Sequence, residues 1–193
     1  MKYNILPKSY NKVHIIGGKL KKAKLNISND YNLRPTSNRV RKAIFSWLDP
    51  LAKGYYCLDC FAGSGVLGIE AISRYSLNVT FLEINNNFFN SLIKNINRLK
   101  LNNISLVNIN ALEWLNNINK PKPFDLVFID PPFFRGMIAK TINLLESLNY
   151  LSHKSIIYIE SEIGQSNYKV PKSWLIYKAK DSNNLSYKLY IRS

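Results

Sequence analysis

The chain has 193 residues, of which 46% are apolar, and this size and composition predict one folded domain with a single core. No apolar stretch approaches the ~18 residues of a membrane helix, and the first twelve residues do not resemble a signal peptide. We therefore expect a cytoplasmic protein with no membrane partner. We also expect a monomer, although no sequence feature specifies the oligomeric state. The formal net charge of +15 predicts an anionic partner, and nucleic acid fits best because phosphate contacts release counterions.

Two thirds of the net charge lies in the N-terminal quarter of the chain. Residues 1–53 contain 12 Lys and Arg against 2 Asp and Glu, which leaves a net +10. Within this region, segments 12–16 and 19–27 alternate polar and apolar residues around Gly17 and Gly18, a pattern that predicts a β-hairpin. We expect this segment to form the nucleic-acid surface.

A cluster of arginines opens the next predicted helix. In Arg34-Pro-Thr-Ser-Asn-Arg-Val-Arg, the proline keeps Arg34 extended, either Thr36 or Ser37 can cap the helix, and apolar residues then recur at helical spacing to about residue 50. Guanidinium groups and backbone amides at such a helix start suit phosphate, although they can also be solvated helix charges. The residues predicted to contact RNA are Arg34, Thr36, Arg39 and Arg41.

From residue 54 onward the pattern alternates strands and helices. Predicted strands span 55–60, 77–83, 104–109, 124–130 and 155–161, and predicted helices span 66–74, 87–100, 111–118 and 137–148. The chain ends with two strands, 174–180 and 185–191, joined by the turn-forming run Asp181-Ser-Asn-Asn. This order predicts an α/β fold with a seven-stranded, mostly parallel sheet, helices on both faces and a C-terminal antiparallel hairpin. We treat 1–193 as one domain, with a basic N-terminal part (12–53) and a core (54–193).

Cys57 and Cys60 form a C-x-x-C motif, which raises the question of a redox pair or a metal site. Both lie in a predicted strand, where a separation of three places them on opposite faces. His14 and His153, the two histidines, stand in unrelated contexts. We therefore predict no disulfide chemistry and no metal.

A glycine-rich loop follows the first core strand. Leu58 to Glu70 contains Gly63, Gly65 and Gly68 as G-x-G-x-x-G, between a predicted strand and a predicted helix. Glycines there permit a tight turn, close approach of a ligand to the backbone, and close packing of the helix on the sheet. Glu83 ends the next strand, about 20 residues later, as expected for a ligand of ribose hydroxyls. Dinucleotide and S-adenosylmethionine sites share this arrangement.

The run Asp130-Pro-Pro-Phe-Phe favours methyl transfer over hydride transfer. It follows the buried-strand run 124–129 and so lies at the carboxyl edge of the sheet. Asp130 and the carbonyls of Pro131 and Pro132 offer acceptors for an exocyclic amine, and Phe133 offers a ring on which a base can stack. A carboxylate pairs with the two adjacent donors of guanine, which favours guanine modestly; adenine stays open, since a carboxylate can accept from an amine alone.

The chain resembles the bacterial 16S ribosomal RNA (guanine(966)-N(2))-methyltransferase family, whose members have a Rossmann-like class I methyltransferase fold. The resemblance spans about residues 13–190 and is carried by Ile15-Ile-Gly-Gly, by the segment from Arg34 to Arg41, by Leu58-Asp-Cys-Phe-Ala-Gly-Ser-Gly, by Phe128-Ile-Asp-Pro-Pro-Phe and by Ile157-Tyr-Ile-Glu-Ser-Glu. Lys42 stands where an acidic residue is common, and about ten residues are added at the N-terminus.

The resemblance implies an S-adenosylmethionine-dependent enzyme that makes N(2)-methylguanine in 16S ribosomal RNA, free or within the small subunit. The cofactor residues that it implies are Asp59, Phe61, Ala62, Gly63, Ser64, Gly65, Glu83, Asn110 and Ala111. The implied guanine site is Asp130, Pro131, Pro132 and Phe133. Three alternatives remain open: a DNA adenine-N(6) methyltransferase, an NAD-dependent dehydrogenase, which would leave the Asp-Pro-Pro-Phe run unexplained, and a non-enzymatic RNA-binding protein.

Overall fold

A computed structural model of the chain describes residues 12–27, 36–49, 54–74, 76–117, 122–132, 136–164, 168–182 and 184–193. Of the residues singled out above, Arg34 and Phe133 lie outside these ranges. No helix in the described ranges has the length and apolar character needed to cross a membrane.

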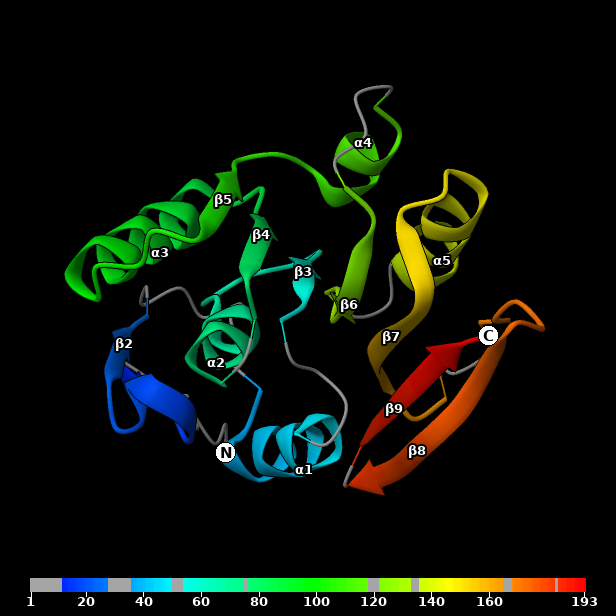
Figure 1. Cartoon of the computed structure of the whole chain (residues 1–193), viewed down its shortest axis with the longest axis horizontal. Helices are drawn as coiled ribbons and strands as arrows, with labels where there is room; N and C mark the ends of the chain where they lie inside the picture. Colours follow the sequence, from blue (N-terminus) through cyan, green and yellow to red (C-terminus); the bar gives the residue numbers. More distant parts are fainter. Residues whose placement is uncertain are drawn as a thin grey trace, which may run out of the picture.

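A seven-stranded sheet forms the centre of the molecule (Figure 1). Its strands are β3 (Tyr56–Asp59), β4 (Asn78–Leu82), β5 (Ile104–Val107), β6 (Phe124–Ile129), β7 (Leu151–Glu162), β8 (Trp174–Ser182) and β9 (Leu185–Arg192). They lie in the order β5-β4-β3-β6-β7-β9-β8. Strands β3 to β7 pair in parallel, whereas β9 pairs antiparallel with both β7 and β8. The predicted parallel sheet and C-terminal hairpin are confirmed.

Helices cover both faces of this sheet, as the alternating pattern predicted. One face packs against α1 (Asn38–Leu48), α2 (Val66–Arg74) and α3 (Asn86–Arg98), and the other packs against α4 (Ala111–Leu115) and α5 (Met137–Ser147). Each face has its own apolar core. Cys57 belongs to the first core and Cys60 to the second, and both are buried free thiols, so their predicted placement on opposite faces is confirmed.

The N-terminal hairpin packs on the α2 face. Strands β1 (Lys12–His14) and β2 (Lys24–Asn26) pair antiparallel, but they are shorter than predicted because a 3-10 turn, Gly18–Leu20, takes up part of the connection. This turn docks on the end of α2, where the backbone N–H of Leu20 donates to Ser73 Oγ at 2.9 Å. Gly18 has φ +70°, and a Cβ there would overlap the Ser73 carbonyl.

Several core elements differ from their predicted bounds, by one to four residues at an end. The strand expected over 104–109 ends at Val107, because the Asn108 side-chain amide donates to the Glu83 carbonyl at 2.7 Å and the chain then turns out of the sheet. Helix α4 ends at Leu115, three residues before the predicted end, and β7 begins at Leu151, four residues before its predicted start. The first difference moves residues 108 and 109 out of the strand and into the loop that leads to Asn110.

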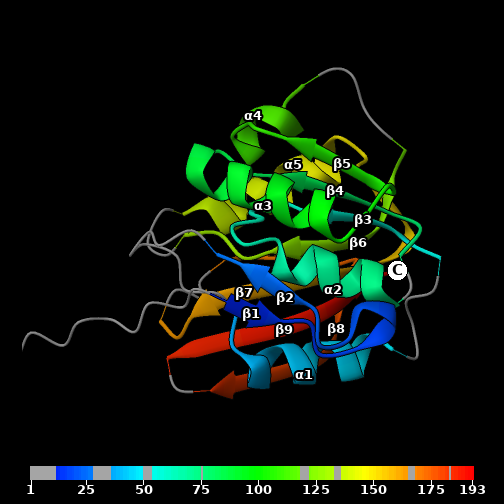
Figure 2. The same ribbon diagram turned by 90° about the vertical axis from the view of Figure 1, so that its left-hand side faces the viewer.

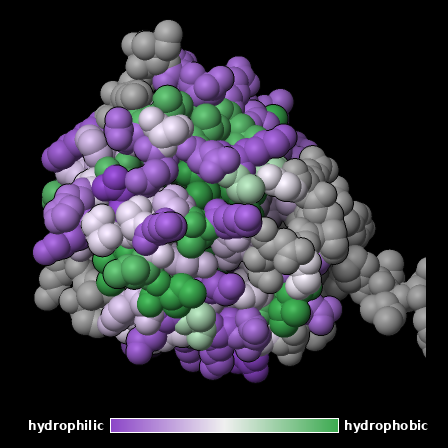
Figure 3. All heavy atoms as spheres, turned by 90° about the vertical axis from the view of Figure 1, so that its right-hand side faces the viewer, coloured by the Kyte–Doolittle hydropathy of each residue, from purple (hydrophilic) through white to green (hydrophobic). Residues whose placement is uncertain are grey.

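Strand β8 forms one edge of the sheet and faces the viewer in Figure 3 among mostly hydrophilic surface with smaller apolar patches. Its pairing with β9 is irregular between Ile176 and Lys178. Leu175, Ile176 and Tyr177 of this strand are exposed. The loops that build the candidate site follow β3, β4, β5 and β6, and β7 and β9 separate these strands from β8 in the sheet.

Candidate active site

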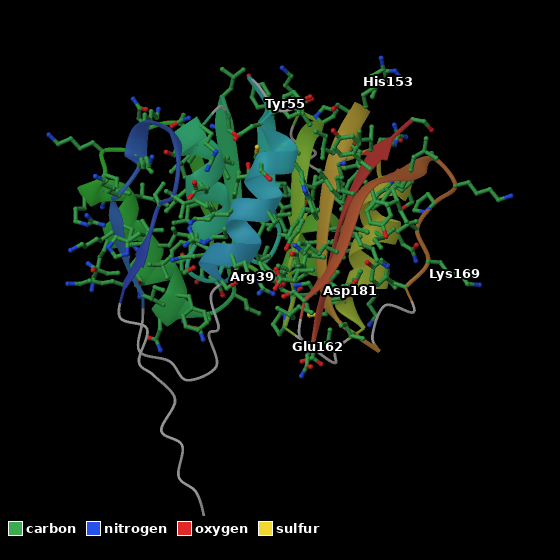
Figure 4. The ribbon with its side chains drawn as sticks, turned by 90° about the horizontal axis from the view of Figure 1, so that it is seen from below. Arg39, Tyr55, His153, Glu162, Lys169 and Asp181 are labelled. Carbon is green, nitrogen blue, oxygen red and sulfur yellow. The ribbon has the colours of Figure 1, made fainter. Side chains whose placement is uncertain are left out.

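A cavity of about 540 Å³ opens at the carboxyl edge of the parallel strands. This is the edge on which Arg39, Glu162 and Asp181 lie in Figure 4, opposite Tyr55 and His153. The cavity brings together twelve of the predicted site residues: Thr36, Asp59, Phe61, Ala62, Gly63, Ser64, Glu83, Asn110, Ala111, Asp130, Pro131 and Pro132. Residues from four separate strand ends and from the start of α1 therefore meet at one site.

The glycine loop turns tightly between β3 and α2. Gly63 and Gly65 have φ values of +51° and +70°, in the left-handed region that residues with a Cβ rarely adopt. The Gly65 N–H donates to the Ala62 carbonyl at 2.6 Å, which closes the turn. Gly65 itself does not line the cavity; a Cβ at Gly65 would overlap Leu92 of α3, so this glycine serves the packing behind the loop.

Gly68 lets α2 lie directly on the sheet. A Cβ at this position would overlap the Phe81 ring of β4 and crowd Val79. The close approach also puts the Gly68 N–H at 3.1 Å from Asp59 Oδ2, so the end of β3 is tied to the first turn of α2. The three roles predicted for the glycines, namely turn, open backbone and close helix packing, all have a counterpart in the geometry.

Asp59 is fully buried beneath the loop, and its surroundings disfavour the ionised carboxylate. Desolvation is the main cause that raises its pKa to about 7, and the hydrogen bond from Gly68 partly opposes the rise. The pKa in the folded chain lies above the ~3.9 of an unfolded aspartate. The associated stability is therefore complete below about pH 4 and is lost as the pH rises through about 7.

We expect Asp59→Asn to stabilise the ligand-free protein at pH 8 but not at pH 4. The pKa of Asp59 in the folded chain is about three units above that in the unfolded chain, which corresponds to at most roughly 4 kcal/mol in the free energy of unfolding. The asparagine variant avoids this loss at pH 8 because its amide cannot ionise. Urea denaturation of both proteins at the two pH values measures the effect. An equal gain at pH 4 and pH 8 would show that ionisation of Asp59 is not its source.

Glu83 holds its carboxylate at the cavity wall through two backbone donors. Gly63 N–H donates to Oε2 at 2.6 Å, and Asn85 N–H donates to Oε1 at 2.7 Å. Burial raises the pKa of Glu83, and these backbone hydrogen bonds work against that rise. Each carboxylate oxygen keeps a lone pair for a further donor, such as a hydroxyl group of a bound ligand.

Asp130 follows β6 and stands half-buried between two other carboxylates. Asp59 ends β3 on one side, and Glu160 near the end of β7 lies on the other, because β3, β6 and β7 are neighbours in the sheet. Burial and the charges of Glu160 and Asp59 raise the pKa of Asp130 well above the usual carboxyl range. These surroundings favour the protonated carboxyl, so the ionised carboxylate of Asp130 has unusual proton affinity.

The structure separates the predicted RNA contacts. Thr36 lines the cavity, whereas Arg39 is exposed and its guanidinium donates to Ser182 of β8. The prediction for Arg41 is wrong: its side chain is fully buried and forms an ion pair with Glu70 of α2 at 3.4 Å, so it has no surface to offer RNA. A residue two positions after Arg39 on a helix lies about 160° away, here on the buried side.

Several cavity residues were not predicted from the sequence. They are mostly apolar or follow strand ends directly: Ile84, Asn85, Phe88, Ile109 and Met137. Ile84 is 63% exposed, an unusual position for a large apolar side chain, and it adjoins the Glu83 carboxylate. Its position immediately after Glu83 is the sequence feature from which a place in the cavity could have been predicted. Asn110 contributes to the wall, while its side-chain oxygen caps α4 by accepting from Leu112 N–H at 2.9 Å.

Comparison with known proteins agrees with this arrangement. Residues 13–191 match the model of the family described as Conserved hypothetical protein 95. "Ribosomal RNA small subunit methyltransferase D" of Buchnera aphidicola subsp. Acyrthosiphon pisum is 49% identical over 183 residues, covering 95% of each chain. The protein of the same name from Escherichia coli K12 is 43% identical over 180 residues, covering 93% of this chain and 90% of the relative.

A solved structure described as a putative methyltransferase yhhF from Escherichia coli superposes with a TM-score of 0.85 at 42% identity, covering 94% of this chain and 98% of that one. The predicted methyltransferase fold is thereby confirmed. With almost its whole length matched by the family model and by these relatives, the chain belongs to the Conserved hypothetical protein 95 family.

Proposed function

We propose that this protein transfers a methyl group from S-adenosylmethionine to the N(2) amine of a guanine in ribosomal RNA of the small subunit. The observation that carries the proposal is the position of the Asp130 carboxylate in the same cavity as the Gly63 loop and Glu83. The names of the relatives support the methyltransferase activity and the ribosomal RNA substrate. The preference for guanine comes from the chemistry of Asp130.

The residues of the cavity fit S-adenosylmethionine. The cavity volume of about 540 Å³ lies within the range of ligand pockets. The backbone of Gly63 at the cavity wall is open to a ligand because glycine has no Cβ to cover it. The anchored Glu83 carboxylate can accept from ribose hydroxyls, and Ile84 and Ile109 offer apolar surface for the adenine ring. When bound, the cofactor supplies a methyl group attached to a sulfonium. The bonding electrons of the C–S bond stay with sulfur as that bond breaks, and the amine lone pair forms the new C–N bond.

Asp130 orients the acceptor amine in this proposal. Guanine presents its ring N1–H and its N(2) amine side by side, so the two carboxylate oxygens can accept one hydrogen bond from each. Pro131 and Pro132 have no N–H groups to compete with those donors for the Asp130 oxygens. The amine then faces the methyl group at a fixed angle, and holding the two reacting groups in this geometry raises the rate of transfer.

The same carboxylate can accept the proton that the amine releases. After methylation the nitrogen carries a positive charge and is strongly acidic, so it loses a proton and becomes the neutral N(2)-methyl amine. The raised pKa of Asp130 makes the carboxylate a better proton acceptor than an exposed aspartate. The proton then passes to water as the product leaves.

A cationic face on the N-terminal hairpin and α3 suits the RNA backbone. It consists of Lys12, Lys19, Lys21, Lys22 and Lys24 of the hairpin with Lys94 and Arg98 of α3, all exposed. Figures 1 and 2 show these elements side by side, and the Arg98 guanidinium donates to the Lys24 carbonyl. Neither segment 12–27 nor segment 84–101 contains an Asp or Glu to neutralise the face. Phosphates are therefore its natural counterions.

We expect the double variant Lys21→Glu, Lys94→Glu to bind small-subunit ribosomal RNA about 10- to 100-fold more weakly at ~0.1 M salt. The slope of log affinity against log salt concentration should fall by about two. The matched control, Lys169→Glu with Lys172→Glu, makes the same change in net charge on exposed residues outside the hairpin and α3, and Figure 4 shows Lys169 on the opposite side of the molecule from the hairpin. Equal losses in both variants would show that net charge alone governs binding.

The proposed reaction is tested by incubating the protein with labelled S-adenosylmethionine and unmethylated small-subunit RNA, free or as assembled subunits. Nucleoside mass analysis should then find labelled N(2)-methylguanosine. If labelled N(6)-methyladenosine is found instead, the proposed methyltransferase activity stands and the assignment of guanine as the target base is rejected. Transfer to duplex DNA but not to RNA would reject the RNA substrate.

A further inference from the structure

Thr36 contacts the carboxylate of Asp130 although 94 residues separate them in the sequence. Its hydroxyl lies 3.3 Å from Asp130 Oδ2, within hydrogen-bond distance, and both residues line the cavity. Thr36 is only 8% exposed, and Ser37, rather than Thr36, caps α1 by accepting from Val40 N–H. The Thr36 hydroxyl is therefore not needed to begin the helix.

A buried guanidinium fixes the backbone of Thr36. Arg41 donates from Nε to the Thr36 carbonyl at 3.2 Å and from Nη1 to the His14 carbonyl of the hairpin at 3.0 Å. The same Nη1 lies 3.4 Å from Glu70 Oε2, and Glu70 also accepts from the Ile16 N–H. Thr36 thus stands on a rigid base formed by the hairpin, α1 and α2 together.

Among the described residues, the other side chains that act on the pKa of Asp130 are two carboxylates. Asp59 faces it from β3 and Glu160 from β7, while the Tyr158 hydroxyl donates to Glu160 at 2.6 Å. The Thr36 hydroxyl, which reaches Asp130 from the α1 side, is the interaction that lowers its pKa against burial and these two charges. A donor on Oδ2 favours the ionised form and fixes the plane of the carboxylate.

We propose that Thr36 is a positioning residue that keeps the Asp130 carboxylate ionised and correctly turned toward the substrate amine. This inference rests on the proposed function for its effect on rate. Its effect on the protonation of Asp130 is independent of the substrate. The segment that was predicted to meet RNA would instead act on the reacting carboxylate through Thr36.

The experiment compares Thr36→Val, which keeps the shape and removes the hydroxyl, with Thr36→Ser, which keeps the hydroxyl. The single-turnover rate of Thr36→Val should fall about 10-fold at pH 7, and the acid limb of its pH profile should move up by about one pH unit. Thr36→Ser should stay within about 3-fold of the wild type. Affinity for S-adenosylmethionine and the melting temperature should change little in either variant.

A second readout does not depend on catalysis. The carboxyl carbon of Asp130, assigned in NMR spectra by comparison with Asp130→Asn, should titrate at higher pH in Thr36→Val than in wild type or Thr36→Ser. If Thr36→Val proves unstable, Thr36→Ala takes its place. Unchanged titration would overturn the proposal, as would equal loss of rate in the Val and Ser variants. A shifted titration in a protein that fails to methylate guanine would reject only the proposed function.

Discussion

Replacing Asp130 with asparagine should lower the rate of methyl transfer to RNA by about 10²- to 10⁴-fold. The amide keeps the size of the carboxylate but replaces one acceptor oxygen with a donor, so one hydrogen bond to the guanine edge becomes a clash of donors. It also removes the group that takes the proton. Because Glu83 and the Gly63 loop are unchanged, affinity for S-adenosylmethionine should stay within a few fold.

Single-turnover assays and calorimetric titration with S-adenosylmethionine measure the two quantities separately. Glu113→Gln serves as the control, since it makes the same kind of change at an exposed carboxylate of α4 that does not line the cavity. An Asp130→Asn protein that retains more than a tenth of the wild-type rate would contradict the role given to Asp130. Equal loss of rate and cofactor affinity would place Asp130 in the cofactor site instead.

The second large effect concerns stability. Arg41→Ala should lower the free energy of unfolding by about 2–4 kcal/mol, because it removes one of the two cations that pair with the fully buried Glu70 and removes donors to the Thr36 and His14 carbonyls, while Arg74 stays 3.1 Å from Glu70. Burial lowers the pKa of Arg41, but Glu70 opposes this and the guanidinium stays charged at neutral pH. Urea denaturation followed by far-UV circular dichroism measures the loss.

The neighbouring arginine provides a matched comparison. Arg39→Ala removes an exposed side chain from the same helix and should cost less than about 1 kcal/mol. The paired change Arg41→Met with Glu70→Leu should be less destabilising than Arg41→Ala, because the buried carboxylate is removed together with its buried cation and Arg74 keeps its ion pair with Asp49. Similar losses for Arg39→Ala and Arg41→Ala would contradict the assignment of Arg41 to the buried network.

The sequence predicted the central sheet and most of the cavity because both depend on local patterns. The apolar runs before Asp59, Glu83 and Asp130 identified three strands, and the carboxyl ends of neighbouring parallel strands must meet at one edge. Gly63 and Gly68 followed from spacing, since a turn with positive φ and a closely packed helix each favour a residue without a Cβ.

Features that depend on tertiary packing were less accessible. Helical spacing placed Arg39 and Arg41 on different sides of α1 but did not show that one side is covered by α2 and the hairpin. The partner of Arg41, Glu70, lies 29 residues away in a helix that is mostly apolar up to its last turn. Likewise, the early end of β5 follows from one side-chain bond, Asn108 to the Glu83 carbonyl, that no local pattern specifies.

The burial of both natural cysteines has a practical consequence for locating the RNA. Burial raises the pKa of Cys57 to about 12 and that of Cys60 well above the usual thiol range, so at neutral pH almost none of either is the reactive thiolate. The sequence contains no further cysteine. A single thiol engineered onto the cationic face would therefore react selectively with a probe, and its attachment point would report which nucleotides lie nearest the hairpin.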